Sequence, residues 1–223
     1  MITNEREDYL KTIYKLEAQS TPVRNTAIAE ALGVEPGSVT GVMKRLAELN
    51  LVNYEPYRGV TLTEAGKKIA LEVIRHHRLI ELYLTEALGY SWDEVDAEAE
   101  MLEHVISEQF EERIADLLGH PEHDPHGYPI PSKDGVMQPH NDVPLTELEA
   151  GQEAVVKRVN DDDPEMLRYL GSLGLLPGTV IEVIEVAPFG GPVHVISGEA
   201  RHALGPDAAS QIYVKVSEPS VDA

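Results

Sequence analysis

Residues 21–52, TPVRNTAIAEALGVEPGSVTGVMKRLAELNLV, predict two short helices joined by a tight turn. The first helix runs from about Asn25 to Leu32, and Gly33 is the kind of residue that ends a helix. The second begins near Pro36 or Ser38 and carries apolar residues at helical spacing along one side. Together they form a helix-turn-helix pattern, which occurs in DNA-reading domains and in small helical bundles.

The flanking residues decide between these two folds. Residues 51–68, LVNYEPYRGVTLTEAGKK, predict a strand, a turn, a second strand and the start of another helix, and residues 4–19 predict a helix before the pattern. The combination is a winged helix over residues 4 to about 70, and an unspecific three-helix bundle is the alternative. Arg58 at the hairpin tip, with Lys44 and Arg45 beside the second helix, favours DNA binding, because these cations lie where the phosphates of a duplex would be.

The formal net charge of −21 argues at first against a DNA-binding protein. Residues 1–68 contain nine basic and nine acidic residues, however, so the entire negative excess lies after residue 68. The winged helix is electrically neutral by itself, and the charge of the whole chain is weak evidence about its partners.

Several classes of protein are excluded by composition. No apolar run approaches the roughly 18 residues of a membrane span, and the charged N-terminus MITNEREDYL lacks an apolar signal core, so we expect a cytoplasmic protein without a membrane partner. The chain contains no cysteine, which rules out disulfides, thiolate zinc sites and iron–sulfur clusters.

Residues 64–88 and 93–118 are each predicted to form a longer helix. The first is apolar on more than one side and so needs more than one neighbour, which favours dimerisation through this helix pair. A linker rich in proline, histidine, glycine and aspartate follows over residues 119–143. From residue 144 short alternating strands, interrupted by a helix at about 164–173, predict a small, partly open β-barrel.

The second of these helices contains the sequence EAEMLEHVISEQF, residues 98–110, with two carboxylates and an imidazole close together. Glu100, Glu103 and His104 have the spacing i, i+3 and i+4, which places residues on one side of a helix. Such a trio by itself is often only a solvated helix face.

Two other helices carry similar groups. His77 and Glu81 are related as i and i+4 in the preceding helix, and Asp8, with Glu7 beside it, lies near the start of the first helix. Carboxylates from three helices repel one another when packed together unless a cation lies among them. The joint pattern therefore predicts a divalent metal site.

The chain resembles the iron- and manganese-dependent repressors of the diphtheria-toxin-repressor type, and most closely the manganese-transport-regulator branch. The resemblance rests on five motifs in the expected order: EDYLKTIYKLE (7–17), the winged-helix segment 28–70, RHHRLIELYL (75–84), EAEMLEHVISEQFEERI (98–114) and HPEHDPHGYPIP (120–131). It implies a mainly α fold with a β-rich C-terminal part. The implied domains are a winged helix-turn-helix over 1–70, a helical metal-binding and dimerisation domain with its linker over 71–143, and an SH3-like domain similar to ferrous-transport accessory proteins over 144–217.

The resemblance also implies two metal sites. The primary site would be formed by Asp8, Glu100, Glu103 and His104. The ancillary site would be formed by His77, Glu81, Asp124, His126 and an acid of the C-terminal domain, with Asp161 preferred and Asp163 the alternative. Lys11 stands where short manganese-sensing members have another acid, which argues against a closely spaced second ion at the primary site.

The donor types indicate which metal the chain binds. Carboxylate oxygens and imidazole suit Mn²⁺ or Fe²⁺, whereas raw affinity at such a site would favour zinc over manganese. We predict Mn(II), with Fe(II) as the alternative and with Zn(II), Co(II) or Cd(II) binding in vitro.

Metal would act by joining the first helix to the dimer scaffold. This would favour the spacing at which both recognition helices of a homodimer enter successive major grooves of double-stranded operator DNA, about 34 Å apart. The resemblance points to the start of the second helix for base reading, and the basic residues and wing tip are candidates for phosphate contacts. The predicted DNA-binding residues are Pro36, Gly37, Ser38, Thr40, Gly41, Lys44, Arg45, Tyr57 and Arg58. For Ser38 the role of helix N-cap is an open alternative.

Three rival interpretations remain. A hydrolytic metalloenzyme is disfavoured because no nucleophile motif or phosphate loop accompanies the winged helix. The chain could instead be a winged-helix regulator that senses an organic ligand. Finally, the β-rich domain could bind a peptide or other partner while the metal is only structural.

Overall fold

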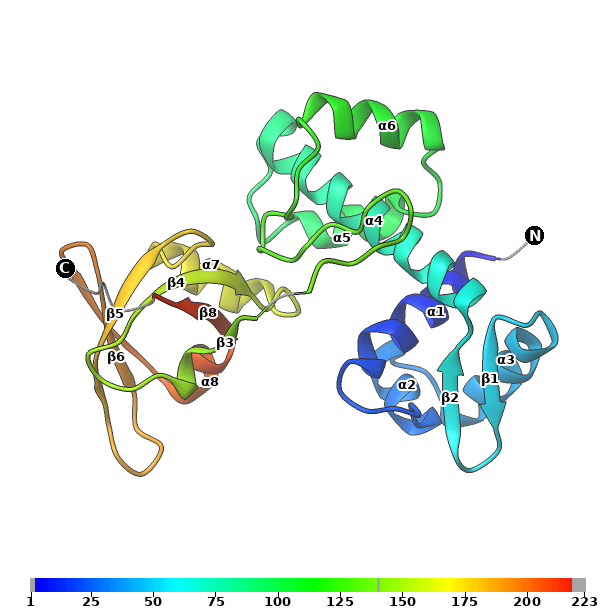
Figure 1. The fold of residues 1–223 in the computed structure, drawn as a ribbon, viewed down its shortest axis with the longest axis horizontal. Coiled ribbons are helices and arrows are strands. Elements are labelled where there is room, and N and C mark those ends of the chain that lie inside the picture. Colours follow the sequence, from blue (N-terminus) through cyan, green and yellow to red (C-terminus); the bar gives the residue numbers. More distant parts are fainter. Residues whose placement is uncertain (1–2, 140, 218–223) are drawn as a thin grey trace, which may run out of the picture. The chain divides into compact units, whose positions relative to one another are not determined.

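The computed structural model describes residues 3–139 and 141–217 (Figure 1). The chain forms two compact units. The first comprises Met1–His77, Leu102–Glu108 and Pro131–Met137. The second comprises Arg78–Met101, Gln109–Ile130 and Gln138–Ala223.

The first unit contains the predicted winged helix. Its elements are α1 (Asn4–Glu17), α2 (Asn25–Leu32), α3 (Pro36–Glu48), β1 (Val52–Glu55), β2 (Gly59–Leu62) and the first half of α4 (Glu64–Leu88). Gly33 ends α2 with a φ of 63°, in the left-handed region that favours glycine. Helix α3 begins at Pro36, so Ser38 lies inside the helix and the alternative role of Ser38 as an N-cap is wrong.

One hydrophobic core holds the winged helix together. Leu10 and Ile13 of α1, Ile28 of α2 and Leu46 of α3 are fully buried in this core, together with Val60 of the hairpin. Full burial of side chains of this size contributes roughly 1.5–3 kcal/mol each. Helix α1 is therefore an integral part of the winged helix, and any contact that restrains α1 also restrains α3.

The helical region that follows differs from the prediction in one respect. Residues 93–118 do not form one helix: α5 (Val95–Leu102) and α6 (Glu108–Leu117) are separated by a turn. The Glu103 carbonyl accepts a hydrogen bond from His76 Nδ1 at 3.0 Å. This bond joins the end of α5 to a residue that is distant in the sequence. Among the described residues, no helix is long and apolar enough to cross a membrane.

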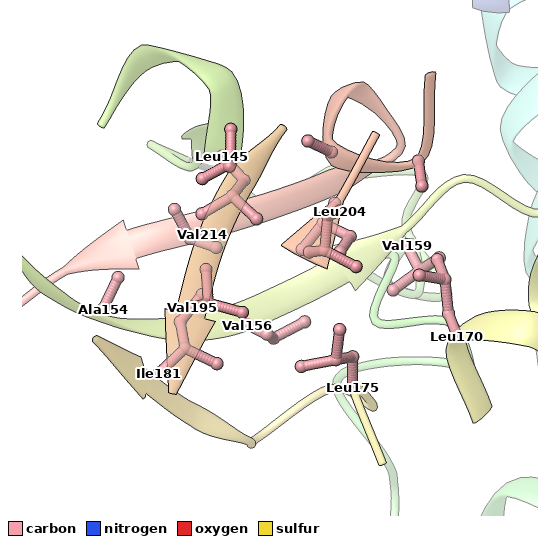
Figure 2. Close-up of a cluster of buried hydrophobic side chains, with 14 of the residues drawn as sticks. Leu145, Ala154, Val156, Val159, Leu170, Leu175, Ile181, Val195, Leu204 and Val214 are labelled. Carbon is pink, nitrogen blue, oxygen red and sulfur yellow. The ribbon is translucent and has the colours of Figure 1, made fainter. Parts of the chain in front are cut away.

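The C-terminal part is a six-stranded antiparallel sheet in the order β3-β8-β4-β5-β6-β7. Its elements are β3 (Val143–Pro144), η1 (Leu145–Glu147), β4 (Glu153–Val159), α7 (Pro164–Ser172), β5 (Val180–Val186), β6 (Val193–Ser197), β7 (Ala200–Leu204), α8 (Pro206–Ser210) and β8 (Ile212–Val216). Alternate residues such as Val156, Val195 and Val214 point into a shared apolar interior, which α7 closes with Leu170 (Figure 2). The prediction of a β-rich C-terminal domain is confirmed.

Candidate metal centre

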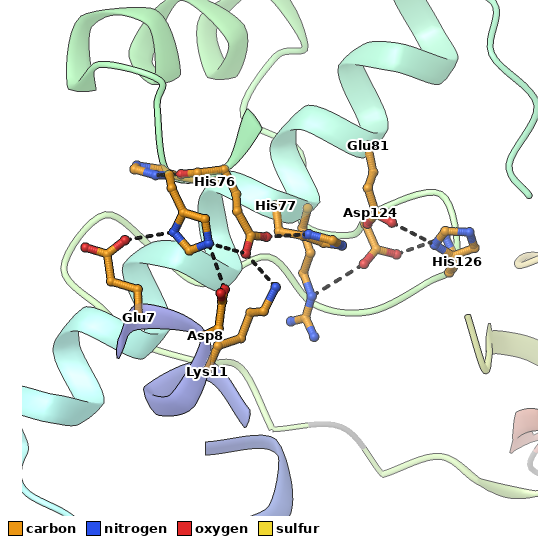
Figure 3. Close-up of polar contacts among 11 residues, drawn as sticks. Glu7, Asp8, Lys11, His76, His77, Glu81, Asp124 and His126 are labelled. Carbon is orange, nitrogen blue, oxygen red and sulfur yellow. Dashed lines mark hydrogen bonds and ion pairs between the residues drawn. The ribbon is translucent and has the colours of Figure 1, made fainter. Parts of the chain in front are cut away.

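A first cluster of potential ligands joins α1 to the turn after α5. Asp8, Glu103 and His104 each present a ligand atom within 4.8 Å of the others. His104 Nε2 lies 2.7 Å from Asp8 Oδ1 and 3.3 Å from Glu103 Oε1 (Figure 3). Burial raises the pKa of the Asp8 carboxyl above its ordinary value, although the nearby imidazole of His104 works against this shift. Two carboxylates and one imidazole at this separation fit a divalent cation of intermediate hardness.

Glu103 is the centre of this cluster and is only 1% exposed. One of its oxygens accepts from Lys11 Nζ at 2.5 Å, and the other lies 2.6 Å from His77 Nδ1. Burial by itself would raise the pKa of Glu103, but the hydrogen bond and charge of His77, followed by the charge of Lys11, hold the pKa below its usual range. Glu103 is thus kept ionised in a buried position.

The end of α5 at Leu102 changes how the residues of the predicted primary site are arranged. Glu103 and His104 lie in the turn beyond α5, so Glu100, Glu103 and His104 do not share one helix face, and the expectation from helical spacing was wrong. Glu100 is exposed in the last turn of α5 and is not among the three gathered residues. His77 Nδ1 lies 2.6 Å from Glu103 Oε2 of the first cluster, and the prediction of His77 for the ancillary site stays a prediction.

A second cluster lies within the second unit. Glu81, Asp124 and His126 are all buried and present ligand atoms within 4.8 Å of one another. His126 Nδ1 is 3.5 Å from Glu81 Oε1, and Arg78 Nε is 3.4 Å from Asp124 Oδ2 (Figure 3). Burial, followed by the negative charge of Glu81, raises the pKa of Asp124 to about 7. Two buried carboxylates in such close proximity are unfavourable without a cation.

Hydrogen bonds show which atoms of this second cluster are available to a cation. Asp124 Oδ1 accepts from the backbone N–H groups of His126 and Tyr128, each at 2.9 Å. His126 Nε2 lies 2.6 Å from the Trp92 carbonyl oxygen and must donate, since a carbonyl can only accept. Within the described residues, buried His126 Nδ1 makes no hydrogen bond. The lone pair of this nitrogen is therefore available to bind a metal. The carboxylate oxygens and the imidazole nitrogen of the second cluster fit a divalent ion.

The choice between Asp161 and Asp163 depends on the start of α7. Asp163 is the N-cap of this helix, and its carboxylate accepts from the backbone N–H groups of Glu165 and Met166 at 2.8 and 3.3 Å. The charge of Asp161, by contrast, contributes to the raised pKa of Asp124, although Asp161 is not among the three residues whose ligand atoms gather there. Asp161 is the better candidate for a ligand from the C-terminal domain.

Gly127 allows the chain to pass close to strand β4 next to His126. Its φ is +92°, and an added Cβ would lie 1.9 Å from the Lys157 carbonyl oxygen. Gly127→Ala is expected to lower the free energy of unfolding by about 3 kcal/mol, because it combines backbone strain with overpacking.

Gly89→Ala is a matched control for this substitution. Gly89 also has a positive φ, +74°, but nothing lies within 4 Å of an added Cβ. Urea denaturation should show a loss of about 1–2 kcal/mol for Gly89→Ala, from the backbone strain alone. Equal losses for the two variants would contradict the role given to the close approach.

The predicted DNA-binding residues lie on α3 and at the hairpin tip. All except Thr40 are exposed: Pro36, Gly37, Ser38, Gly41, Lys44, Arg45, Tyr57 and Arg58. Arg45 pairs with Glu48 at 2.7 Å, and Arg58 pairs with Glu55 at 3.2 Å. A DNA phosphate would have to compete with these carboxylates for each guanidinium.

Thr40 has a different environment from the other residues of this surface. It is half-buried, and its hydroxyl accepts from the Asn25 side-chain amide at 3.3 Å. The same amide donates to the Tyr54 hydroxyl at 3.3 Å. Asn25 thus links α2, α3 and β1, and Thr40 helps to orient α3.

Sequence reasoning missed several groups at the two clusters. His76 donates to the Glu103 carbonyl, and the Trp92 carbonyl orients His126. Backbone carbonyls leave no signature in a sequence. The adjacent pair His76–His77 was visible, but nothing in its spacing showed that His76 would bond to a backbone atom.

Three family models match consecutive parts of the chain. Residues 1–60 match the family model described as iron dependent repressor, N-terminal DNA binding domain, and residues 63–132 match iron dependent repressor, metal binding and dimerisation domain. Residues 143–216 match the FeoA domain.

Individual relatives match over nearly the whole chain. The iron-dependent repressor IdeR of Mycobacterium tuberculosis is 34% identical over 96% of this chain and 98% of its own. A solved manganese-dependent transcriptional repressor in complex with manganese is 38% identical, with a TM-score of 0.87, and covers 95% of this chain and 99% of that one. ScaR with bound Cd²⁺ is 34% identical, with a TM-score of 0.80, over 94% of this chain and 98% of that one.

Proposed function

The chain belongs to the iron-dependent repressor family, and on that premise we propose that it represses metal-uptake and metal-homeostasis genes as an Mn(II)-loaded homodimer on operator DNA. At the level of the family, it is a metal-dependent transcriptional repressor, and the prediction that it is not an enzyme is confirmed by its relatives. The finer assignments, to manganese, to a dimeric operator complex and to particular residues, are proposals.

The observation that carries the proposal is the position of the first cluster. Asp8 lies on α1, which shares a core with the helix-turn-helix, whereas Glu103 and His104 lie in the turn after α5. A divalent ion bound by all three would hold α1 against that turn and offset the repulsion between the carboxylates. Metal binding would thereby favour one orientation of the DNA-reading domain.

We assign residues to the sites as follows. The first site uses Asp8, Glu103 and His104, with Glu100 as a further predicted ligand, and His77 stays a predicted ligand of the second site. The second site uses Glu81, Asp124, His126 and Asp161. The DNA surface comprises α3 and the wing tip, the dimer forms through residues 71–143, and the domain boundaries lie near residues 70 and 143.

Manganese is supported by donor chemistry and by relatives. The gathered atoms are carboxylate oxygens and imidazole nitrogens, and the chain has no cysteine to provide a softer ligand. A manganese-dependent repressor is among the most similar solved structures. Fe(II) is the alternative, because iron-dependent repressors are also relatives at similar identity.

The proposal is tested by titrating operator fragments with the protein in buffered series of Mn(II), Fe(II) and Zn(II). Mn(II) is expected to raise operator affinity by about 5- to 150-fold, and operator DNA should tighten Mn(II) binding by the same factor. A metal-stripped protein that binds its operator as tightly as the loaded form would contradict the proposal. Operator binding that responds to Fe(II) but not to Mn(II) would replace manganese by iron.

The second site can be observed separately through Trp92, the chain's single tryptophan. Its ring stacks on that of His126, with centroids 5.8 Å apart and an interplanar angle of 28°. Paramagnetic Mn²⁺ at this site is expected to quench Trp92 fluorescence. The quenching should be lost in Glu81→Gln and retained in Asp8→Asn, whereas equal quenching in both variants would show that the signal does not come from the second site.

A further inference from the structure

The first cluster contains a carboxylate that is not one of its gathered ligands. Glu7 and Asp8 are neighbours on α1, and both reach His104. His104 Nδ1 lies 2.7 Å from Glu7 Oε2, and His104 Nε2 lies 2.7 Å from Asp8 Oδ1 (Figure 3). The two carboxylates therefore face opposite nitrogens of one imidazole ring.

The two ring nitrogens are not equivalent in their surroundings. Nε2 faces Asp8 and is also 3.3 Å from Glu103 Oε1, so it points to where carboxylate oxygens from two segments converge. Nδ1 faces Glu7, which is outside the group of residues whose ligand atoms gather within 4.8 Å. A cation bound by Asp8 and Glu103 would consequently meet Nε2.

We propose that Glu7 is a positioning residue for His104 and not a metal ligand. Its carboxylate accepts the Nδ1–H hydrogen bond, which fixes the orientation of the ring and leaves Nε2 to bind the metal. The His104 side chain is 6% exposed and that of Glu7 20% exposed, so water is a weak competitor for this bond. A carboxylate on the outer nitrogen of a ligating histidine also makes the ring a stronger donor. This inference rests on the proposed function, because it requires a metal at the first site.

The first test observes the Nδ1 proton directly. In Co(II)-loaded protein, a histidine bound through Nε2 retains its Nδ1–H, whose NMR signal is strongly shifted by the paramagnetic ion and disappears in D₂O. We expect one such signal that is absent in His104→Gln. Exchange of this proton with solvent should be at least about tenfold faster in Glu7→Ala, where the acceptor is lost, and close to wild type in Glu7→Gln, whose amide oxygen still accepts.

The second test measures Co(II) affinity at the first site. Glu7→Ala should weaken binding by about 10- to 100-fold, as is typical for loss of a group that orients a ligand, and Glu7→Gln should recover most of it. Glu5→Ala is the charge-matched control, because Glu5 is an exposed residue in the same first turn of α1. Thermal melting of the metal-free variants checks that they fold. If Glu7→Ala does not fold, the Co(II) affinity of Glu7→Gln still tests the inference.

Three results would overturn the inference. Equal losses of Co(II) affinity in Glu5→Ala and Glu7→Ala would show that Glu7 acts only through its negative charge. If Glu7→Gln lost as much Co(II) affinity as Glu7→Ala, Glu7 would be identified as a metal ligand. Exchange of the shifted proton that is unchanged in Glu7→Ala would show that Glu7 is not its acceptor, as expected for a metal bound to Nδ1. A wild-type chain that binds no Co(II) would instead refute the proposed function itself.

Discussion

Replacement of Glu103 with alanine is expected to remove the metal response of operator binding and to destabilise the metal-free protein by roughly 3–5 kcal/mol. Glu103 contributes to both effects through one carboxylate. It is a central member of the first cluster, and it pairs with Lys11, which is itself only 6% exposed. Without Glu103 the Lys11 ammonium stays buried with its main anionic partner removed, and a divalent ion loses a ligand. Gel shifts with and without Mn(II), and urea denaturation without metal, measure the two effects.

A double-mutant cycle separates these two effects. Lys11→Met in the Glu103→Ala background removes the buried charge and should restore a large part of the lost stability, whereas the metal response should remain absent. Glu108→Ala, an exposed residue of the same segment, controls for the loss of a negative charge. If Glu103→Ala kept a full Mn(II) response, the first cluster would not be the regulatory site.

Lys11 changes the interpretation of the first cluster. The sequence marked it as a departure from the pattern of short manganese-sensing members, and the structure places its ammonium 2.5 Å from Glu103. A fixed monovalent cation thus already neutralises part of the buried negative charge. This supports a single divalent ion at the first site, because a second ion would have to displace or repel Lys11.

The winged helix and the β domain could be predicted because their local signals agree with their packing. Gly33 and Pro36 bound the turn between α2 and α3, and both act through backbone geometry that does not depend on distant residues. In the C-terminal domain, the alternation in EAVVKRV predicted a strand at 153–159, where β4 is observed. Short elements such as β3 and α8 were missed, because two to five residues carry too little periodicity.

The break after Leu102 could not be predicted from spacing. The apolar pattern of residues 93–118 continues through the turn. However, the Glu103 carbonyl accepts a hydrogen bond from His76, and the Glu103 carboxylate contacts Lys11 and His77. These partners are distant in sequence, and their combined interactions outweigh local helix propensity. Glu103 and His104 do lie together with Asp8, but the reason given for the grouping, a shared helix face with Glu100, was wrong.

The contribution of Asp124 to the stability of the metal-free protein is expected to fall as pH rises from about 4 to about 7. The pKa of Asp124 is about 7 in the folded protein, raised by burial and by Glu81 from its ordinary value of 3.8. Between these two values the unfolded chain has lost the proton and the folded chain retains it. The folded state therefore binds more protons, and its stability falls with increasing pH, by about 4 kcal/mol over the whole interval.

Asp124→Asn isolates this contribution from the many other acidic groups of the chain, since asparagine keeps the size of the side chain and does not titrate. Between pH 5 and 8, urea denaturation without metal should show a loss of stability about 3 kcal/mol larger in wild type than in the variant. Metal should reverse the trend in wild type, because a divalent ion favours the ionised carboxylate and binds more tightly as the proton leaves. Parallel pH profiles for wild type and Asp124→Asn would mean that Asp124 is ionised in the folded protein and that Arg78, 3.4 Å away, neutralises it without a metal.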